Sequence, residues 1–299
     1  MGQKYHSKLV NASEIIKKAR QNKYAVGHFN INNLEWTKSL LETAQETKTP
    51  IILGASEREI KYIGGYNLVV AMVNALLDSL NITVPVTLHL DHGQSVESCK
   101  TAINAGFSSV MYDGSHHPFV ENLKNTKEVV EYAKLNAVSI EAEIGTIGGE
   151  EDDGVVGAGE IGDPKEAAEM VKTGIDFLAV GIGNIHGPYP KGWPGLNFQA
   201  LEDIQAAAKI GMVLHGGSGI PQEQVKKAIS LGVSKINVNT ELQIAFVSAT
   251  RKYIKEGKDK PENGKGFDPR KLLKPGYEAI KATFDELISW FGCKGKGKG

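Results

Sequence analysis

Three of the eight histidines in this 299-residue chain are followed directly by a glycine, namely His92, His186 and His215. Three imidazoles with a fourth position left open for substrate form a common catalytic zinc site. Asp91 precedes the first of them and adds a carboxylate at the same place. A simpler interpretation makes Asp91 a turn residue and His92 a hydrogen-bonded structural residue. The three histidines together favour a metal site over that interpretation.

The residues around Asp91 predict the elements that position it. Residues 84–90 are apolar and partly β-branched, as in a buried strand. Residues 96–105 carry an apolar stripe at helical spacing, and Ser95 is placed to cap that helix. Asp91 and His92 are therefore expected where a strand ends and a helix follows, which is where α/β proteins place catalytic groups.

Strand and helix patterns alternate along the whole chain. Strands are predicted at residues 24–30, 50–55, 84–90, 108–113, 138–143, 177–181, 212–215 and 235–239. Helices are predicted at residues 12–21, 34–48, 67–80, 96–105, 120–134, 165–173, 199–208, 222–231, 240–255 and 275–291. Eight strands, each followed by a helix, predict an α/β fold of the (β/α)8 TIM-barrel type with an additional C-terminal helix. A doubly wound open sheet is the alternative, but such sheets seldom contain so many evenly spaced units.

In such a barrel the carboxyl ends of the strands meet in one ring, and polar residues occupy those ends in this chain. They are Asn30, Ser56, Asp91, His92, Asp113, Glu143, His186, His215 and residues 237–240. The other histidines fit the ring less well: His6 precedes the fold, and His116 and His117 are adjacent in a loop. His28 and His89 lie inside predicted strands. His89 is the strongest competitor as a ligand, with a core histidine as its simpler interpretation.

The predicted ring lacks a lysine that could form an imine with a carbonyl substrate. Residues 177–181 contain none. Lys235 is expected at the amino end of its strand, on the wrong face of the barrel, and Lys191 in a solvated loop. If this barrel activates a carbonyl group, the sequence therefore predicts that a metal ion does so.

Two turns after the last two strands predict a phosphate site. Residues 216–219 read Gly-Gly-Ser-Gly, and residues 237–240 read Asn-Val-Asn-Thr. The corresponding loops are the usual phosphate site of this barrel. Glycines let backbone N–H groups approach an anion, and a helix that begins near Pro221 adds the positive end of its dipole.

Two connections are long for a compact barrel. Residues 145–164 are glycine-rich and include four consecutive acidic residues, and residues 183–197 contain Gly, Pro and Trp193. Long loops of this kind are commonly functional lids or disordered tips, and both are expected on the face of the barrel that carries the ring.

Composition limits the class of protein. The formal net charge of −1 gives no electrostatic case for nucleic acid or a membrane as the main partner. Cys99 and Cys293 make no disulfide framework and fit a reducing cytoplasm. No targeting or membrane-spanning segment is predicted. One domain is expected over residues 1–292, and the Lys/Gly-rich residues 293–299 are expected to be disordered.

Six segments together resemble the class II fructose-bisphosphate aldolases of the shorter bacterial type. They are residues 24–30 (Tyr-Ala-Val-Gly-His-Phe-Asn), 90–93 (Leu-Asp-His-Gly), 184–188 (Asn-Ile-His-Gly-Pro), 215–219 (His-Gly-Gly-Ser-Gly), 235–241 (Lys-Ile-Asn-Val-Asn-Thr-Glu) and 267–273 (Phe-Asp-Pro-Arg-Lys-Leu-Leu). The similarity covers nearly the whole chain, and the motifs are specific when taken together.

This resemblance implies roles for the residues of the ring. His92, His186 and His215 would bind a catalytic zinc ion, and Asp91 would be the acid/base that transfers a proton. Substrate or phosphate contacts are expected of Asn30, Ser56, Gly187, Gly216, Gly217, Ser218, Asn237, Val238, Asn239 and Thr240.

Four further residues take implied roles away from the zinc site. Asp113 and Glu143 match a second, peripheral site for a divalent metal or a monovalent cation, with two solvated rim acids as the simpler interpretation. Glu151 matches a glutamate of a mobile loop that transfers a proton. Arg270 matches an arginine that reaches the phosphate pocket of a neighbouring subunit, with a surface arginine as the alternative.

The resemblance predicts a lyase that cleaves fructose 1,6-bisphosphate reversibly to dihydroxyacetone phosphate and glyceraldehyde 3-phosphate in glycolysis and gluconeogenesis. It also predicts a cytoplasmic homodimer or higher homo-oligomer. Tagatose 1,6-bisphosphate aldolase is the alternative within the class, and its close relatives carry Ala where this chain has Asn239, which favours fructose. A zinc hydrolase is the alternative from another reaction class, but it would not need two phosphate loops. Nothing in the sequence supports a non-enzymatic surface role.

Overall fold

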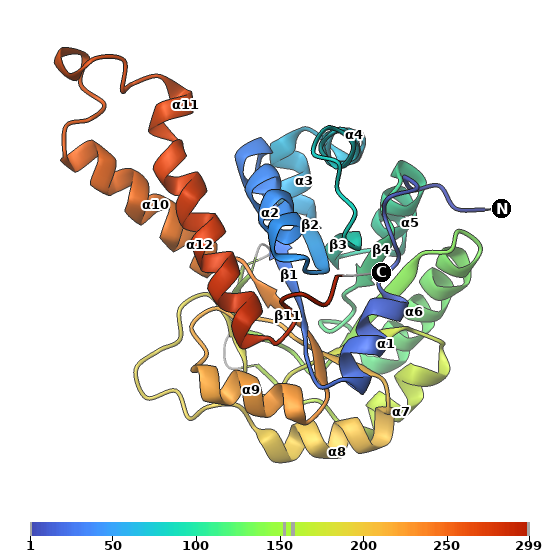
Figure 1. Ribbon diagram of the computed structural model, residues 1–299. Helices are drawn as coiled ribbons and strands as arrows, with labels where there is room; N and C mark the ends of the chain where they lie inside the picture. Colours follow the sequence, from blue (N-terminus) through green and yellow to red (C-terminus); the bar gives the residue numbers. More distant parts are fainter. Residues whose placement is uncertain (1, 152–153, 157–158, 298–299) are drawn as a thin grey trace.

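The computed structural model describes residues 2–151, 154–156 and 159–297, and its centre is a closed barrel of parallel strands (Figure 1). The strands are β1 (Val26–Asn30), β2 (Ile51–Ser56), β3 (Val86–Gly93), β4 (Ser109–Tyr112), β5 (Ser139–Ile144), β8 (Phe177–Val180), β10 (Gly211–Leu214) and β11 (Val233–Val238). Around the barrel they follow the order β1-β11-β10-β8-β5-β4-β3-β2. The predicted (β/α)8 architecture is confirmed, and the open-sheet alternative is wrong because β1 pairs with β11 and closes the sheet.

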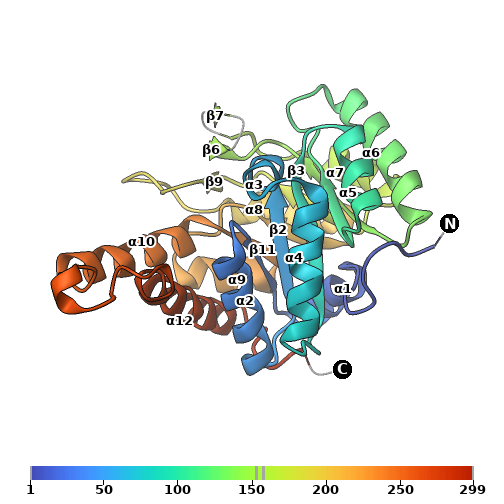
Figure 2. The ribbon, with the colours of Figure 1, turned by 90° about the horizontal axis from the view of Figure 1, so that it is seen from above.

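Helices surround the barrel (Figure 2). They are α1 (Ser13–Gln21), α2 (Leu34–Thr47), α3 (Glu57–Ile63), α4 (Tyr66–Ser79), α5 (Val96–Ala105), α6 (Phe119–Lys134), α7 (Pro164–Lys172), α8 (Phe198–Ala208) and α9 (Gln222–Ser230). Local sequence sets where several of them begin. The Ser95 side chain accepts a hydrogen bond from the Ser98 amide, which confirms the predicted cap of α5, and Asn33 caps α2 in the same way. No single helix among the described residues could span a membrane by length and composition; α3 and α4 meet that test only together, across a 77° bend.

An irregularity in β3 directs two neighbouring side chains to the same end of the barrel. The register between β3 and β4 shifts between Leu90 and Gly93, where β3 carries one extra residue. His92 lies in this bulge with a φ of +46°, a conformation that residues other than glycine rarely adopt. Side chains alternate between faces along a regular strand, so the bulge explains how Asp91 and His92 both line one cavity.

A small sheet that the sequence analysis did not predict lies over this end of the barrel. It consists of β6 (Gly148–Glu151), β7 (Gly154–Val156) and β9 (Ile185–His186), in the order β7-β6-β9. The two long connections supply its strands, since β6 and β7 belong to the first and β9 belongs to the second. Glycine-rich sequences rarely indicate strands, which is why composition alone pointed to loops.

The chain after the barrel forms an arm that projects from it (Figure 1). The arm contains α10 (Thr240–Lys255), the short 3-10 helix η1 (Pro261–Asn263), α11 (Pro269–Leu272) and α12 (Lys274–Trp290). α12 packs back on the barrel, where Phe284 contacts Phe29 with ring centroids 4.7 Å apart. The arm carries exposed apolar side chains, namely Ile244, Val247, Ile254 and Phe267.

The division into one domain and a tail stays a prediction. At the end of α12, Cys293 is buried in the core. The Gly295 and Gly297 amides donate hydrogen bonds to the carbonyls of Thr47 and Lys48 at the end of α2. These contacts tie the first residues of the Lys/Gly-rich segment to the body of the protein.

Candidate active site

Three strands bring the predicted histidine ligands together at the carboxyl end of the barrel. His92 lies in β3, His186 in β9, and His215 directly after β10. Their candidate ligand atoms lie within 4.8 Å of one another, and the Nδ1 atom of His215 is 3.0 Å from the Nε2 atom of His92. Three imidazoles that converge in this way are a suitable donor set for a zinc ion.

Two of these histidines each contact a carboxylate through the ring nitrogen that does not face the other histidine. The Asp113 carboxylate lies 2.7 Å from the Nδ1 atom of His92, and the Glu141 carboxylate lies 2.7 Å from the Nε2 atom of His215. Carboxylates behind histidine ligands orient the rings and fix which nitrogen carries the proton. Asp113 was predicted only as a ligand of a peripheral cation, and its contact with His92 was not predicted. It also forms a possible ligand group with His92 and Glu143, so the peripheral cation site stays a prediction.

Asp91 is buried at the floor of the same cavity, held by two side-chain amides. Asn30 donates to one carboxylate oxygen at 3.0 Å and Asn237 to the other at 3.2 Å. Burial alone raises the pKa of Asp91, but the neighbouring imidazoles of His28, His92 and His215 and the Lys235 ammonium outweigh it, and the pKa lies well below its usual range. The carboxylate is therefore ionised, which is the protonation state that a proton acceptor requires.

A cavity of about 330 Å³ opens above these groups. Predicted site residues that line it are Asn30, Ser56, Asp91, His92, His186, Gly187, Gly216, Ser218, Asn237, Asn239 and Thr240. Other predicted residues are buried behind this lining: Asp113 and His215 contact His92, Glu143 lies near them, Gly217 follows β10, and Val238 is the last residue of β11.

The structure does not show two of the predicted site residues at this cavity, one because it lies elsewhere and one because its side chain is not described. Arg270 lies in α11 on the arm, where its side chain is 89 % exposed and paired with Asp268. The backbone of Glu151 ends β6, but its side chain lies outside the described part of the structure.

The two turns expected to bind phosphate meet at the cavity. Gly216 has a φ of +63°, and a Cβ atom there would lie 1.9 Å from the Ile185 carbonyl oxygen, so only glycine fits. The Gly217 amide donates to the Asn237 carbonyl and thereby ties one turn to the other. α10 begins at Thr240 beside the cavity, and its first N–H groups are suited to an anion.

Residues of α3 that the sequence analysis missed complete the cavity wall. They are Glu57, Arg58 and Glu59, with Gln94 and Gln243 from other elements. Glu59 accepts hydrogen bonds from Asn30 and from the Ser56 amide, and so connects two predicted site residues. The signal was present as the Ser-x-x-Glu capping box of residues 56–59, which predicts a helix start directly after the second strand.

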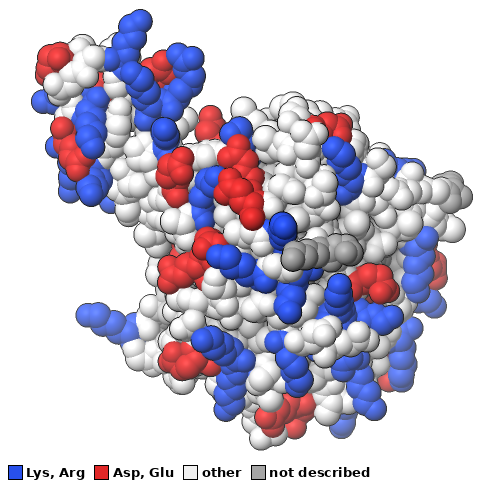
Figure 3. Space-filling view, in the orientation of Figure 1, with Lys and Arg blue, Asp and Glu red and all other residues white. Residues whose placement is uncertain are grey.

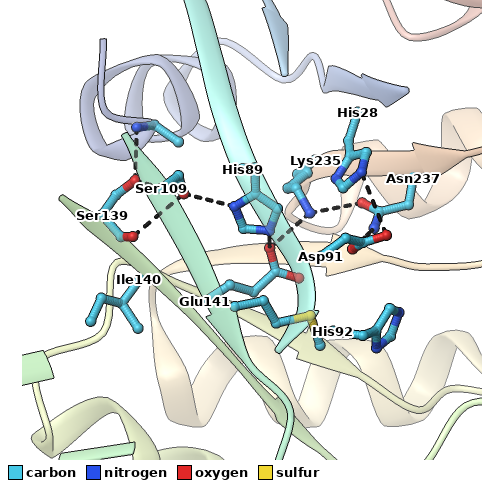
Figure 4. Close-up of polar contacts among 12 residues, drawn as sticks. His28, His89, Asp91, His92, Ser109, Ser139, Ile140, Glu141, Lys235 and Asn237 are labelled. Atoms are coloured by element: carbon cyan, nitrogen blue, oxygen red, sulfur yellow. Dashed lines mark hydrogen bonds and ion pairs between the residues drawn. The ribbon is translucent and has the colours of Figure 1, made fainter. Parts of the chain in front are cut away.

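Lys235 corrects the prediction that no lysine enters the barrel. β11 begins at Val233, two residues earlier than predicted, so Lys235 lies in the middle of the strand rather than at its amino end. Its side chain is fully buried inside the barrel, 2.7 Å from Glu141 (Figure 4). Lys235 is not one of the described residues that line the cavity. The interior also contains His28 and His89, and the interpretation of His89 as a core histidine is confirmed by its complete burial and its contact with Ser109.

Comparison with known proteins identifies the family. The family model for class-II fructose-bisphosphate aldolase matches residues 10–296. This chain belongs to that family. It is 55 % identical over 290 residues to the fructose-bisphosphate aldolase of Geobacillus stearothermophilus, covering 96 % of this chain and 98 % of that protein. It is 54 % identical over 288 residues to the fructose-bisphosphate aldolase of Mycoplasma pneumoniae, covering 96 % of this chain and 99 % of that protein.

Solved structures agree with the sequence relatives. The crystal structure of a putative fructose-1,6-biphosphate aldolase from Coccidioides immitis superposes with a TM-score of 0.82 at 32 % identity, covering 96 % of this chain and 98 % of that one. The predicted resemblance is thus confirmed, as is the prediction of an enzyme of the aldolase class, which is a class of lyases. The alternative from another reaction class, a zinc hydrolase, is not supported.

Proposed function

We propose that this protein catalyses the zinc-dependent, reversible cleavage of fructose 1,6-bisphosphate to dihydroxyacetone phosphate and glyceraldehyde 3-phosphate. The observation that carries the proposal is the convergence of three imidazoles and an ionised carboxylate on one cavity, beside two turns that suit phosphate. The names of the relatives favour fructose over tagatose bisphosphate as the substrate.

The donor set supports zinc as the metal. His92, His186 and His215 would hold it, because three nitrogen ligands and an open position suit a catalytic zinc site. When bound, the ion would supply a Lewis acid for the carbonyl and positive charge for the oxygen that becomes negative during cleavage. We assign a second cation, a divalent metal or a monovalent ion, to the group that includes Asp113 and Glu143.

The protein's own residues supply the proton transfers. In the cleavage direction Asp91 accepts the proton of the C4 hydroxyl, the O–H electron pair becomes the aldehyde C=O bond, and the C3–C4 bond breaks. The electrons of that bond pass to the ketone as an enediolate, and Glu151 returns a proton to its carbon. Asn30 and Asn237 hold Asp91 in position for the first step.

A homodimer is part of the proposal. The arm contains the basic residues Arg251, Lys252, Lys255 and Arg270, and Figure 3 shows basic and acidic side chains together on it. The arm also carries four exposed apolar side chains. Both features favour contact with a second copy of the chain, whose phosphate turns Arg270 would reach. Two buried, unpaired cysteines support a cytoplasmic location.

A coupled assay for triose phosphate release tests the proposal. Fructose 1,6-bisphosphate should be cleaved, tagatose 1,6-bisphosphate more slowly, and a strong chelator should abolish both activities until zinc is added. Borohydride with substrate should leave no covalent adduct, because Lys235 is paired with Glu141. An adduct detected by mass spectrometry, or full activity without metal, would refute the zinc mechanism.

A further inference from the structure

Beneath the active site, the barrel interior contains a completely buried ion pair. The Lys235 ammonium lies 2.7 Å from the Glu141 carboxylate, and both side chains have no exposed area. Figure 4 shows the pair inside the barrel, with Asn237 and Asp91 on one side and His89 on the other. Burying two charges is costly even when they are paired, and hydrophobic residues of similar volume are often equally stable. The position of the pair therefore calls for a role other than stability.

On one side, the lysine determines how Asn237 is oriented. Its ammonium donates to the Asn237 side-chain oxygen at 2.8 Å. Because an ammonium group only donates hydrogen bonds, the amide oxygen must face Lys235 and the amide NH2 must face away from it. That NH2 group donates to Asp91 at 3.2 Å. If the amide turned over, its oxygen would face the Asp91 carboxylate and repel it.

On the other side, the glutamate determines the tautomer of His215. The Glu141 carboxylate contacts the Nε2 atom of His215 at 2.7 Å. An ionised carboxylate only accepts hydrogen bonds, so Nε2 must carry the proton. The other carboxylate oxygen of Glu141 lies 2.7 Å from the Lys235 ammonium, so the group that faces His215 is one half of an ion pair. The Nδ1 atom of His215, directed at His92, is then left with its lone pair.

We propose that Lys235 and Glu141 are a positioning pair that fixes the hydrogen-bond direction of two active-site groups at once: Asn237, which orients the base Asp91, and His215, which presents Nδ1 to the metal. This inference deepens the proposed function and rests on it. Lys235 holds the amide with its donor, Glu141 holds the imidazole with its acceptor, and the 2.7 Å contact between the two links both interactions.

The first test separates the asparagine side from the histidine side. A single Lys235→Met change would leave a buried carboxylate unpaired, so Lys235→Met is combined with Glu141→Gln. The glutamine oxygen can still accept from His215, whereas Asn237 loses its donor. We expect one zinc per chain, a KM within about twofold of wild type and a kcat lower by roughly 10- to 100-fold, because a base that is no longer fixed is misplaced.

The second test addresses the histidine side. Lys235→Met with Glu141→Leu removes both contacts, and we expect zinc affinity to fall by roughly 10- to 100-fold, with a changed visible spectrum of the cobalt-substituted protein. In the wild-type zinc protein, 15N NMR should show a proton on the Nε2 atom of His215. This measurement needs no variant and decides the tautomer even if a double variant fails to fold.

Ser109→Ala is the matched control, since it removes a buried contact to His89 in the same part of the interior without touching Asn237 or His215. It should lower the unfolding temperature and leave kcat unchanged. The inference is overturned if Lys235→Met/Glu141→Gln keeps wild-type kcat, or if Nε2 of His215 carries no proton. Absence of cleavage by the wild-type zinc enzyme would instead refute the proposed function, so the two failures are distinguishable.

Discussion

The surroundings of Asp91 differ strongly from those of a free carboxylate. It is nearly completely buried, which raises its pKa, yet the neighbouring His28, His92 and His215 imidazoles and the Lys235 ammonium outweigh this effect and keep the pKa well below the usual range. It is therefore ionised at neutral pH, the form in which it can act as a proton acceptor. His92, its neighbour in the bulge of β3, directs a ring nitrogen at His215 instead. Adjacent residues thus take different tasks.

Substitution of these neighbours should cause different failures. Asp91→Ala should keep stoichiometric zinc and bind substrate but lose roughly 10²- to 10⁴-fold in kcat, because a positioned proton-transfer group is removed. His92→Ala should lose tightly bound zinc, as measured by atomic absorption after gel filtration. A near-normal kcat for Asp91→Ala would show that another group moves the proton.

Asp113 offers a second test at this scale. Since its carboxylate holds the Nδ1 atom of His92, Asp113→Ala should weaken binding of the catalytic zinc by roughly 10- to 100-fold. Titration against a chelator of known affinity measures this, with Asp163→Asn at the cap of α7 as a distant control. Unchanged affinity for the first zinc, with loss of a second metal equivalent, would assign Asp113 to the peripheral site alone.

At the scale of elements, the two long connections and the arm are additions to the basic barrel. β6 and β9 pair across the two connections, so β9 and its histidine are held by the same sheet that carries the acidic segment. The arm carries Arg270 on α11, away from the cavity of its own barrel. The connections carry His186 and Glu151 and the arm carries Arg270, three predicted site residues that do not lie at the ends of barrel strands.

Glu151 is expected to act from the end of β6. Glu151→Ala should slow exchange of the hydroxymethyl proton of dihydroxyacetone phosphate with solvent more than it weakens substrate binding, because the enediolate loses its proton donor. Proton NMR in deuterated buffer measures the exchange. Exchange at the wild-type rate would mean that the acidic run of the segment is only a solvated surface.

Arg270 is expected to act on the partner subunit. Asp91→Ala and Arg270→Ala variants, each inactive or weakened, are mixed under conditions of subunit exchange. If the arginine works across the interface, every mixed dimer has one site with both residues intact, and random pairing restores about a quarter of all sites. If Arg270 serves its own barrel, the mixture gains no activity.

For the whole molecule, the polar groups inside the barrel make its stability sensitive to acid. His28, His89 and His215 are completely buried, and desolvation lowers the pKa of each, to about 4 for His215. In the unfolded chain their pKa values return to about 6.5. Below that pH the unfolded state binds protons that the folded state does not.

Stability of the metal-free protein should therefore fall as pH decreases from 6.5 to 5. A histidine that stays neutral in the folded state contributes up to about 1.4 kcal/mol per pH unit to the free energy of unfolding as the pH falls below 6.5. The pKa values of three carboxylates are lowered in the folded protein: Asp91, Asp113 and Glu141. These groups decrease the free energy of unfolding only below about pH 4.5, where carboxylates of the unfolded chain become protonated. Urea unfolding at a series of pH values measures the slope. A flat profile between pH 6.5 and 5 would contradict it.

The sequence by itself determined the barrel and the gathering of three histidines and two glycine- and asparagine-containing turns at its carboxyl end. Alternating strand and helix patterns are compatible with only a few folds. In a closed barrel of parallel strands the carboxyl ends of all strands lie on the same face. A glycine within each of residues 90–93 and 215–219 follows a histidine directly, and this local pattern can be recognised in the sequence before the fold is known. Helix α3 was missed although its capping box of residues 56–59 was present, because a seven-residue helix is too short for a periodic pattern.

Only the tertiary structure decided what the interior residues do. Glu141 and Lys235 are 94 positions apart, and nothing in either segment predicts that they pair. A difference of two residues in where β11 begins moves Lys235 from the amino end of the strand to the barrel interior, an accuracy that sequence patterns do not reach. The β3 bulge likewise depends on pairing with β4. Strand register and hydrogen-bond direction are properties of the closed barrel, so they become defined only when the chain has folded.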